Sequence, residues 1–160
     1  MPEETAAGEL LSSLWRVNHA LEMLSKRMLR VHGVTGPQRM VINIIAQRPG
    51  IGANGVSTAA RIHPSTLSGI LDRLERSALI VRARDAVDGR RARFEVTPGG
   101  QRLHEVRSGT VQAAVMRSLH ALAPEERAVV RRWLQGFGDE LEKERMAMEA
   151  MVPAEPPPEP

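Results

Sequence analysis

The stretch HPSTLSGILDRLERSAL, residues 63–79, decides the fold class of this 160-residue chain. Pro64 suits the first turn of a helix, because the N–H that proline lacks would have no intrahelical partner there. The apolar residues recur three and four positions apart, which places them on one helical face: Leu67, Ile70, Leu71 and Leu74. The opposite face keeps small polar and basic residues: Ser65, Thr66, Ser68, Gly69, Arg73 and Arg76. The pattern predicts a helix with one buried side and one side free to contact a partner.

The segment before this helix, GIGANGVSTAARI (residues 50–62), predicts a shorter helix lined by Val56, Ala59 and Ala60. Its start is loosened by three glycines, Gly50, Gly52 and Gly55. A short helix, a tight turn and a second helix that begins with small polar residues are typical of a helix-turn-helix. In that motif the second helix enters the major groove of DNA.

The segment after it, RARDAVDGRRARFEVT (residues 82–97), predicts a β-hairpin. Residues 79–84 and 91–96 form its arms, and Asp88-Gly89 is a strong turn signal because glycine accepts a positive φ freely. The hairpin holds five arginines: Arg82, Arg84, Arg90, Arg91 and Arg93. Beside a helix-turn-helix, such a wing can neutralise phosphates and place a tip arginine in a narrow minor groove. The alternative is a solvated hairpin whose charges only protect its strand edges.

Two further helices are predicted before the motif. Residues 9–31 carry an apolar stripe of heptad type, which indicates packing against a partner helix: Leu10, Leu14, Val17, Leu21, Leu24, Met28 and Val31. Thr35 and Gln38 form a capping box that starts the next helix, which ends at Arg48–Gly50. The inner face of that helix is expected to hold Met40, Val41, Ile44 and Ile45.

Two helices and a tail are predicted after the hairpin. Thr97 and Pro98 start a helix that is expected to run through Gly109, which weakens it by about 1 kcal/mol relative to alanine. This helix carries Leu103, Val106, Val111, Val115 and Leu119. Pro124 opens the last helix, whose apolar face holds Val130, Trp133, Leu134, Phe137 and Leu141. The tail, residues 147–160, is rich in proline and glutamate and is expected to be disordered.

Composition restricts the function. The 22 Lys and Arg and 19 Asp and Glu give a net charge of +3, and the isoelectric point of about 10.4 favours an anionic partner. Because cysteine is absent and the histidines lack metal-ligand spacing, no metal or cofactor is expected. With two Trp, two Phe and no Tyr, single-strand binding by base stacking is disfavoured. No apolar run reaches transmembrane length and the acidic N-terminus is unlike a signal peptide, so we expect a cytoplasmic protein without a membrane partner.

An enzymatic function is not expected. The glycine-rich segment GIGANG, residues 50–55, neither follows a predicted strand nor carries a Walker lysine, so it does not predict a phosphate-binding loop. No Ser-His-Asp set and no pair of carboxylates stands out. Winged helices also serve as dimerisation modules in larger enzymes, but no catalytic domain remains after residue 145.

The whole set of elements resembles the MarR family of winged-helix transcriptional regulators over roughly residues 10–145. The motifs that carry the resemblance are Pro64-Ser65-Thr66, Leu71-Asp72-Arg73-Leu74-Glu75, the wing residues Asp85, Asp88 and Arg90, and Val96-Thr97-Pro98-Gly99-Gly100. The resemblance implies a mainly α fold with a small β-hairpin wing. It implies a dimerisation helix over 9–31, a winged helix-turn-helix over 35–97 and dimerisation helices over 98–146.

The resemblance also implies a homodimeric repressor on double-stranded DNA. Two-fold symmetry predicts a pseudo-palindromic operator with half-sites about 10 base pairs apart. The dimer interface is expected to include Leu10, Leu14, Val17, Leu21, Trp133, Leu134, Phe137 and Leu141. The expected DNA-binding residues are Ser65, Thr66, Ser68, Gly69, Arg73, Arg84, Asp88, Arg90, Arg91 and Arg93. Of these, Asp88 is expected to orient Arg90 rather than to meet the DNA, because phosphates repel a carboxylate.

The chain departs from the family's pattern at four positions. Gly69 stands where the family often has arginine, and His63 stands where an aspartate N-cap is usual. Arg61 replaces a turn glycine, and Gly55 replaces a helix former. Because serine and threonine read bases weakly, we expect the wing and the phosphate contacts to supply more of the affinity, with a strong salt dependence.

The alternative functions are a winged-helix antirepressor that binds protein and an architectural DNA-binding protein.

Many members of the family release DNA when a small aromatic acid binds. Some members use an arginine and a histidine of the first helix for this. Arg16 and His19, with Trp15 beside them, are therefore candidates for binding a small-molecule inducer. The alternative is that His19 is only a solvated residue, because it lies opposite the apolar stripe.

Overall fold

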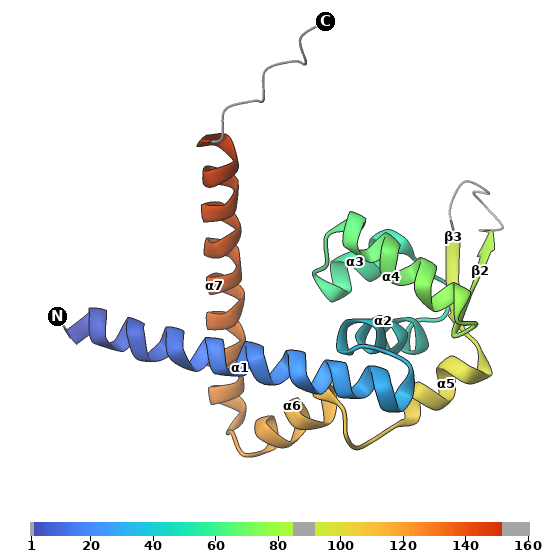
Figure 1. Ribbon diagram of the computed structural model, residues 1–160, viewed down its shortest axis with the longest axis horizontal. Coiled ribbons are helices and arrows are strands. Elements are labelled where there is room, and N and C mark those ends of the chain that lie inside the picture. The colour runs from blue at the N-terminus through green and yellow to red at the C-terminus, as the bar shows by residue number, and fades with distance from the viewer. Residues whose placement is uncertain (1, 85–91, 152–160) are drawn as a thin grey trace, which may run out of the picture. The chain divides into compact units, whose positions relative to one another are not determined.

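The computed structural model describes residues 2–84 and 92–151, and it divides into two compact units, residues 1–115 and 116–160. The first unit contains α1 (Pro2–His32), α2 (Gly36–Gln47), β1 (Ile51–Gly52), α3 (Ala53–Ala60), α4 (Pro64–Arg76), β2 (Ile80–Arg84), β3 (Ala92–Val96) and α5 (Pro98–Glu105). Helix α6 (Val111–His120) runs from the first unit into the second, which contains α7 (Pro124–Met151). Figure 1 shows α2, α3 and α4 gathered beside the β2–β3 hairpin. The predicted winged helix-turn-helix fold is confirmed.

The sheet has three antiparallel strands in the order β1-β3-β2, one more than the hairpin predicted. β3 pairs with β2 from Ala92 to Val96 and with β1 through Phe94 and Arg93. The glycine-rich residues 50–55 were predicted only to weaken the start of a helix, but two of them, Ile51 and Gly52, form strand β1. Gly55 makes this possible: a Cβ there would lie 2.9 Å from Ile51 Cγ1, so glycine lets the β1 side chain pack on α3.

The core lies where α2, α4 and the sheet meet. Its fully buried apolar residues are Val34, Val41, Ile42, Ile45, Val56, Leu67, Leu71, Leu74, Ile80 and Phe94. The inner face of α4 is the predicted one. The predicted inner face of α2 is wrong at Met40, which is 39% exposed, whereas Ile42 is buried.

The capping box at the start of α2 is confirmed. Thr35 Oγ1 accepts the N–H of Gln38, and Gln38 Oε1 accepts the N–H of Thr35 at 2.9 Å. The next N–H, that of Gly36, donates to Ser25 Oγ of α1 at 2.9 Å. The first N–H groups of α2 therefore have partners, one of which joins α2 to α1.

The helix predicted to run through Gly109 is instead two helices, α5 and α6, separated by residues 106–110. Gly109 has φ +67°, a left-handed conformation that glycine adopts without steric cost. Thr110 Oγ1 then accepts the N–H of Ala113 at 3.1 Å, so it caps the start of α6. Gly109 is thus a turn residue and not a weak point inside a helix.

A buried cation holds the two sides of this break. Arg39 of α2 is 3% exposed, and its Nη2 donates to the carbonyls of Val106 at 2.6 Å and His104 at 3.3 Å. Its Nη1 donates to Gln112 Oε1 at 2.7 Å. Burial, and then the positive charge of Arg107, lower the pKa of Arg39. Within the described residues its Nε has no hydrogen-bond partner.

The same cluster includes two more polar side chains. Asn43 Nδ2 donates to Gln112 Oε1 at 2.5 Å, and Asn43 Oδ1 lies 2.9 Å from His104 Nδ1. The cluster thus joins α2, α5 and α6 by hydrogen bonds. The sequence pattern had indicated only apolar helix faces in these segments and did not predict the polar cluster.

The two long helices extend beyond their predicted bounds. α1 begins at Pro2 rather than residue 9, and α7 continues to Met151 rather than ending at 146. Residues 152–160 of the predicted tail lie outside the described residues. Within the described residues, no helix is long and apolar enough to cross a membrane.

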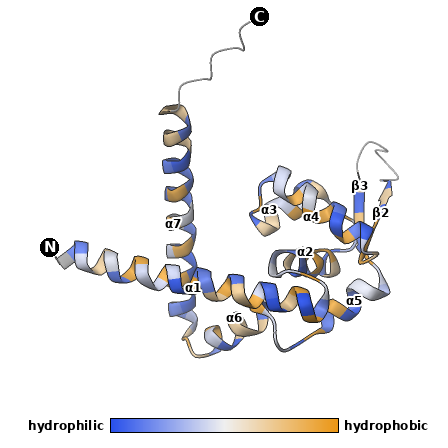
Figure 2. Ribbon diagram, viewed as in Figure 1, coloured by the Kyte–Doolittle hydropathy of each residue, from blue (hydrophilic) through white to orange (hydrophobic). Residues whose placement is uncertain are grey.

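Both long helices expose apolar side chains. Figure 2 shows hydrophobic and hydrophilic residues mixed along each of these helices. Met28 is the one fully buried residue of the stripe along α1, whereas Leu10, Val17 and Leu21 are exposed. On α7, Trp133 and Phe137 stack at a centroid distance of 5.2 Å. Trp133, Leu134 and Leu141 are exposed.

The turn between α3 and α4 contains a strained residue. Arg61 is the C-cap of α3 and has φ +52°, in the left-handed region where a Cβ is unfavourable. We expect Arg61→Gly to raise the free energy of unfolding by about 0.5–1 kcal/mol, because glycine removes this strain. Urea unfolding measures the change.

The matched control is Ala59→Gly, an exposed position inside α3. It is expected to lower the free energy of unfolding by about 0.5–1 kcal/mol. A less stable Arg61→Gly protein would contradict the assignment of strain to Arg61.

Candidate nucleic-acid interface

The outward face of α4 is polar. Ser65, Thr66, Ser68, Gly69 and Arg73 are all exposed, and Leu67, Leu71 and Leu74 are buried on the other side. A Cβ on Gly69 would meet nothing within 4 Å, so the centre of this face is open. The face can offer hydroxyl groups to the edges of bases.

His63 caps the first turn of α4. Its Nδ1 accepts the N–H of Ser65 at 3.4 Å and lies 2.8 Å from Ser65 Oγ. Pro64 follows at the first helical position, as predicted. The residue that departs from the aspartate expected of the family thus still caps the helix.

The described arginines of the hairpin lie on two faces of the sheet. Because side chains alternate along a strand, Arg82 and Arg84 of β2 share one face. Arg93 is paired with Ala83 and Gly52, so it lies on the other face, and its Nη1 donates to the carbonyl of Gly50 at 3.0 Å. Arg93 therefore cannot contact the same side of a bound partner as Arg82 and Arg84.

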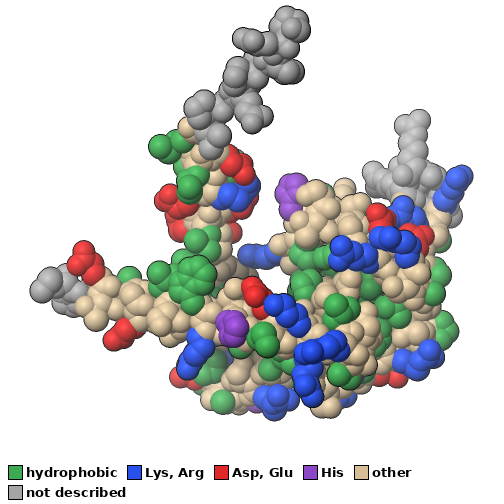
Figure 3. All heavy atoms as spheres, in the orientation of Figure 1, with side chains coloured by type: hydrophobic (Ala, Val, Ile, Leu, Met, Phe, Trp, Pro, Cys, Tyr) green, Lys and Arg blue, Asp and Glu red, His purple; other side chains and the backbone are tan. Residues whose placement is uncertain are grey.

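Arg82 joins the wing to α4. Its guanidinium lies 3.5 Å from Asp72 and 3.4 Å from Glu75, and 5.3 Å from the centre of the Phe94 ring. Acidic side chains accordingly lie among basic ones beside the wing in Figure 3. Sequence reasoning missed this role; the signal was the spacing of Asp72 and Glu75 on one side of α4.

Three of the predicted DNA-binding residues, Asp88, Arg90 and Arg91, fall in 85–91 and lie outside the described residues. Arg84, the last described residue of β2, is exposed at the start of this segment. The roles of the wing tip stay predictions.

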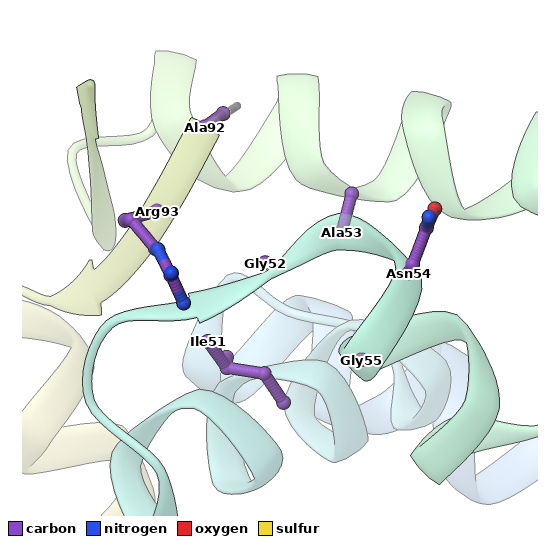
Figure 4. A pocket seen from close by; sticks show the side chains of 7 residues that line it. All are labelled: Ile51, Gly52, Ala53, Asn54, Gly55, Ala92 and Arg93. Carbon is purple, nitrogen blue, oxygen red and sulfur yellow. The ribbon is translucent and has the colours of Figure 1, made fainter. Parts of the chain in front are cut away.

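A hollow of about 590 Å³ lies where β1, β3 and the first turn of α3 meet. Figure 4 shows the side chains that line it, with Arg93 extending from β3 toward the backbone of β1 and Asn54 on α3. The other lining residues are Ile51, Gly52, Ala53, Gly55 and Ala92. Among the residues that the structure describes, this lining includes the guanidinium of Arg93 and the amide of Asn54, and none of them carries a carboxylate.

Arg73 lies on a different side of α4 from the wing-facing carboxylates. With Arg76 it lines a hollow of about 380 Å³ that also includes Leu29 of α1 and Gln38 of α2. The candidate inducer residues lie elsewhere on α1: Trp15, Arg16 and His19 are all exposed, Trp15 by 66%. Nothing in the arrangement of these three residues tests a ligand role, so it stays a prediction.

Known proteins share this architecture along the chain. A family model described as MarR family matches residues 32–91. The PcaV transcriptional regulator of Streptomyces coelicolor is 30% identical in a match that covers 86% of this chain and 98% of that one, with a TM-score of 0.57. The chain belongs to the MarR family.

Other MarR-like proteins are similar over most of their length. The transcriptional repressor Rv2887 of Mycobacterium tuberculosis is 24% identical over 79% of this chain and 91% of its own. A MepR–DNA complex of S. aureus is 25% identical, covers 82% of this chain and 97% of that one, and has a TM-score of 0.66. A second PcaV structure, with its natural ligand, is 28% identical, covers 79% and 89%, and has a TM-score of 0.65.

Proposed function

We propose that this MarR-family chain is a homodimeric, sequence-specific repressor that binds a pseudo-palindromic operator in double-stranded DNA. The observation that carries the proposal is the exposed face of α4, where Ser65, Thr66 and Ser68 stand over a buried leucine stripe and beside a basic wing. In a helix-turn-helix such a face enters the major groove, and the wing contacts the adjacent backbone. The DNA complex of MepR and the repressor Rv2887 support the assignment.

We assign DNA binding and dimerisation to different segments of the chain, according to which side chains are exposed. Residues 35–97 bind DNA, and the helices within 9–31 and 98–146 form the dimer. The exposed apolar side chains of α1 and α7 support this role, because a second copy can cover them. The proposed interface includes the apolar residues Leu10, Leu14, Val17, Leu21, Trp133, Leu134, Phe137 and Leu141.

A small-molecule inducer and the absence of enzymatic activity complete the proposal. Trp15, Arg16 and His19 are the proposed ligand-binding residues, which is consistent with a PcaV structure that holds a ligand. The protein is proposed not to be an enzyme, and to act in the cytoplasm, where the DNA of its bacterial relatives lies.

The test is selection of bound duplexes from a random DNA pool at about 0.1 M salt, where phosphate contacts are screened but not abolished. The expected result is an inverted repeat. Arg90→Ala is expected to weaken binding to that repeat by about 10- to 100-fold, because a dimer loses two wing arginines. Arg102→Ala, an equal change of charge at an exposed position of α5, is the control.

A folded dimer that enriches no sequence would contradict the proposal. The second candidate, a protein-binding antirepressor, is favoured by one observation, the open position at Gly69, which leaves the centre of α4 without a base-reading side chain. In that case Arg90→Ala would leave the binding of the protein partner unchanged.

A further inference from the structure

We infer that His63 fixes Ser65 as a hydrogen-bond acceptor, so that this serine selects an amino-bearing base, adenine or cytosine, in the operator. The inference rests on the proposed function and deepens it. It assigns His63 a positioning role in base recognition, through Ser65 and without a contact to a base.

The geometry at the start of α4 determines the direction of the hydrogen bonds. His63 Nδ1 accepts the backbone N–H of Ser65 at 3.4 Å. A backbone N–H can only donate, so Nδ1 carries a lone pair and its ring proton is on Nε2. A lone pair facing the first turn also suits the positive end of the helix dipole.

The second contact of the same nitrogen then has one direction. Ser65 Oγ lies 2.8 Å from Nδ1, a normal distance for a hydrogen bond. Because Nδ1 has no hydrogen to give, the hydroxyl of Ser65 is the donor, and it shares the single lone pair of Nδ1 with the longer backbone N–H contact in a three-centre hydrogen bond. Its only hydrogen is used inside the protein, and Oγ is left with two lone pairs for a partner.

Ser65 is exposed in the first turn of α4, the part of a recognition helix that reaches base edges. An oxygen that can only accept forms hydrogen bonds with the amino groups of adenine or cytosine in the major groove. It cannot donate to O6 and N7 of guanine, to O4 of thymine or to a phosphate. Thr66 and Ser68 differ, because for their hydroxyls the described part of the chain shows no partner.

The experiment compares five proteins: the wild type, His63→Ala, Ser65→Ala, the double variant and the control Ser68→Ala. The operator selected by the wild type is synthesised with each base pair changed in turn, and the Kd of each protein for each duplex is measured. Ser65→Ala keeps the cap on the N–H, and it is expected to lose preference at one base pair per half-site. Ser68→Ala is the control for a hydroxyl that His63 does not contact, and thermal unfolding monitors the loss of the cap.

At that base pair, His63→Ala is expected to improve binding to the guanine or thymine duplex relative to the selected one by about five- to tenfold, because the freed hydroxyl can donate. In the background of Ser65→Ala the same substitution is expected to change all duplexes equally. A uniform change for His63→Ala in the wild-type background would show a merely structural cap and overturn the inference, as would a Ser65→Ala protein with unchanged preferences. A wild-type protein that selects no sequence contradicts the proposed function itself, which is a distinct result.

Discussion

Gly100→Ala is expected to lower the free energy of unfolding by about 3 kcal/mol or more, or to prevent folding. A Cβ on Gly100 would lie 2.1 Å from the carbonyl oxygen of Leu79 and 3.3 Å from Val96 Cβ. The clash is with backbone, so a change of side-chain rotamer cannot relieve it. The same carbonyl accepts the N–H of Thr97 at 3.1 Å, which holds it in place between α4 and β2.

The neighbouring glycine provides the control. A Cβ on Gly99 would have its nearest contacts at 3.4 Å from Thr97 Oγ1 and 3.6 Å from Leu79 Cδ2, which are ordinary distances. Gly99→Ala is therefore expected to change the free energy of unfolding by less than about 1 kcal/mol. Urea unfolding followed by circular dichroism measures both variants, and equal effects at the two positions would contradict the role of the Leu79 carbonyl.

Arg39→Ala is expected to lower the free energy of unfolding by about 2–4 kcal/mol, because the carbonyls of His104 and Val106 lose their donors. His104 and Val106 are half-buried, and a carbonyl left without a donor in such a place has a penalty at the lower end of about 1–3 kcal/mol. Removal of a poorly solvated cation offsets part of the loss. The segment between α5 and α6, residues 106–110, should also become less rigid, since Gln112 loses one of its two donors.

Hydrogen exchange distinguishes this local effect from a general one. In Arg39→Ala the amides of residues 106–113 are expected to exchange faster than those of β3, relative to the wild type. Arg102→Ala removes an exposed arginine of α5 and is expected to stay within about 0.5 kcal/mol of the wild type. An Arg39→Ala protein as stable as this control would contradict a structural role for the buried cation.

The parts of the fold that sequence predicted well are those with local signals. The Thr35–Gln38 capping box, Pro64 at the first position of α4 and the spacing of Leu67, Leu71 and Leu74 each depend on residues within a few positions of one another. Their geometry is set by the helix itself, so the pattern in the sequence is enough.

The parts that sequence missed depend on contacts between distant residues. β1 exists because Ile51 and Gly52 pair with Phe94 and Arg93, about 40 positions later, and a two-residue strand has no periodicity to detect. The break at residues 106–110 depends on a cation from α2. The site had the same limit: Ser65 was identified from its position on α4, but its bond to His63 required coordinates.

The contact of Arg82 with both Asp72 and Glu75 alters the electrostatic potential that α4 presents. Exposed ion pairs of this kind contribute little to folding, about 0–1 kcal/mol. A polyanion that approaches α4, however, would meet two carboxylates, and Arg82 makes the potential near them less negative. Arg82 thus reduces repulsion that the protein itself creates. Arg84, which shares this face of the wing and is exposed at the end of β2, adds positive potential that phosphates can meet.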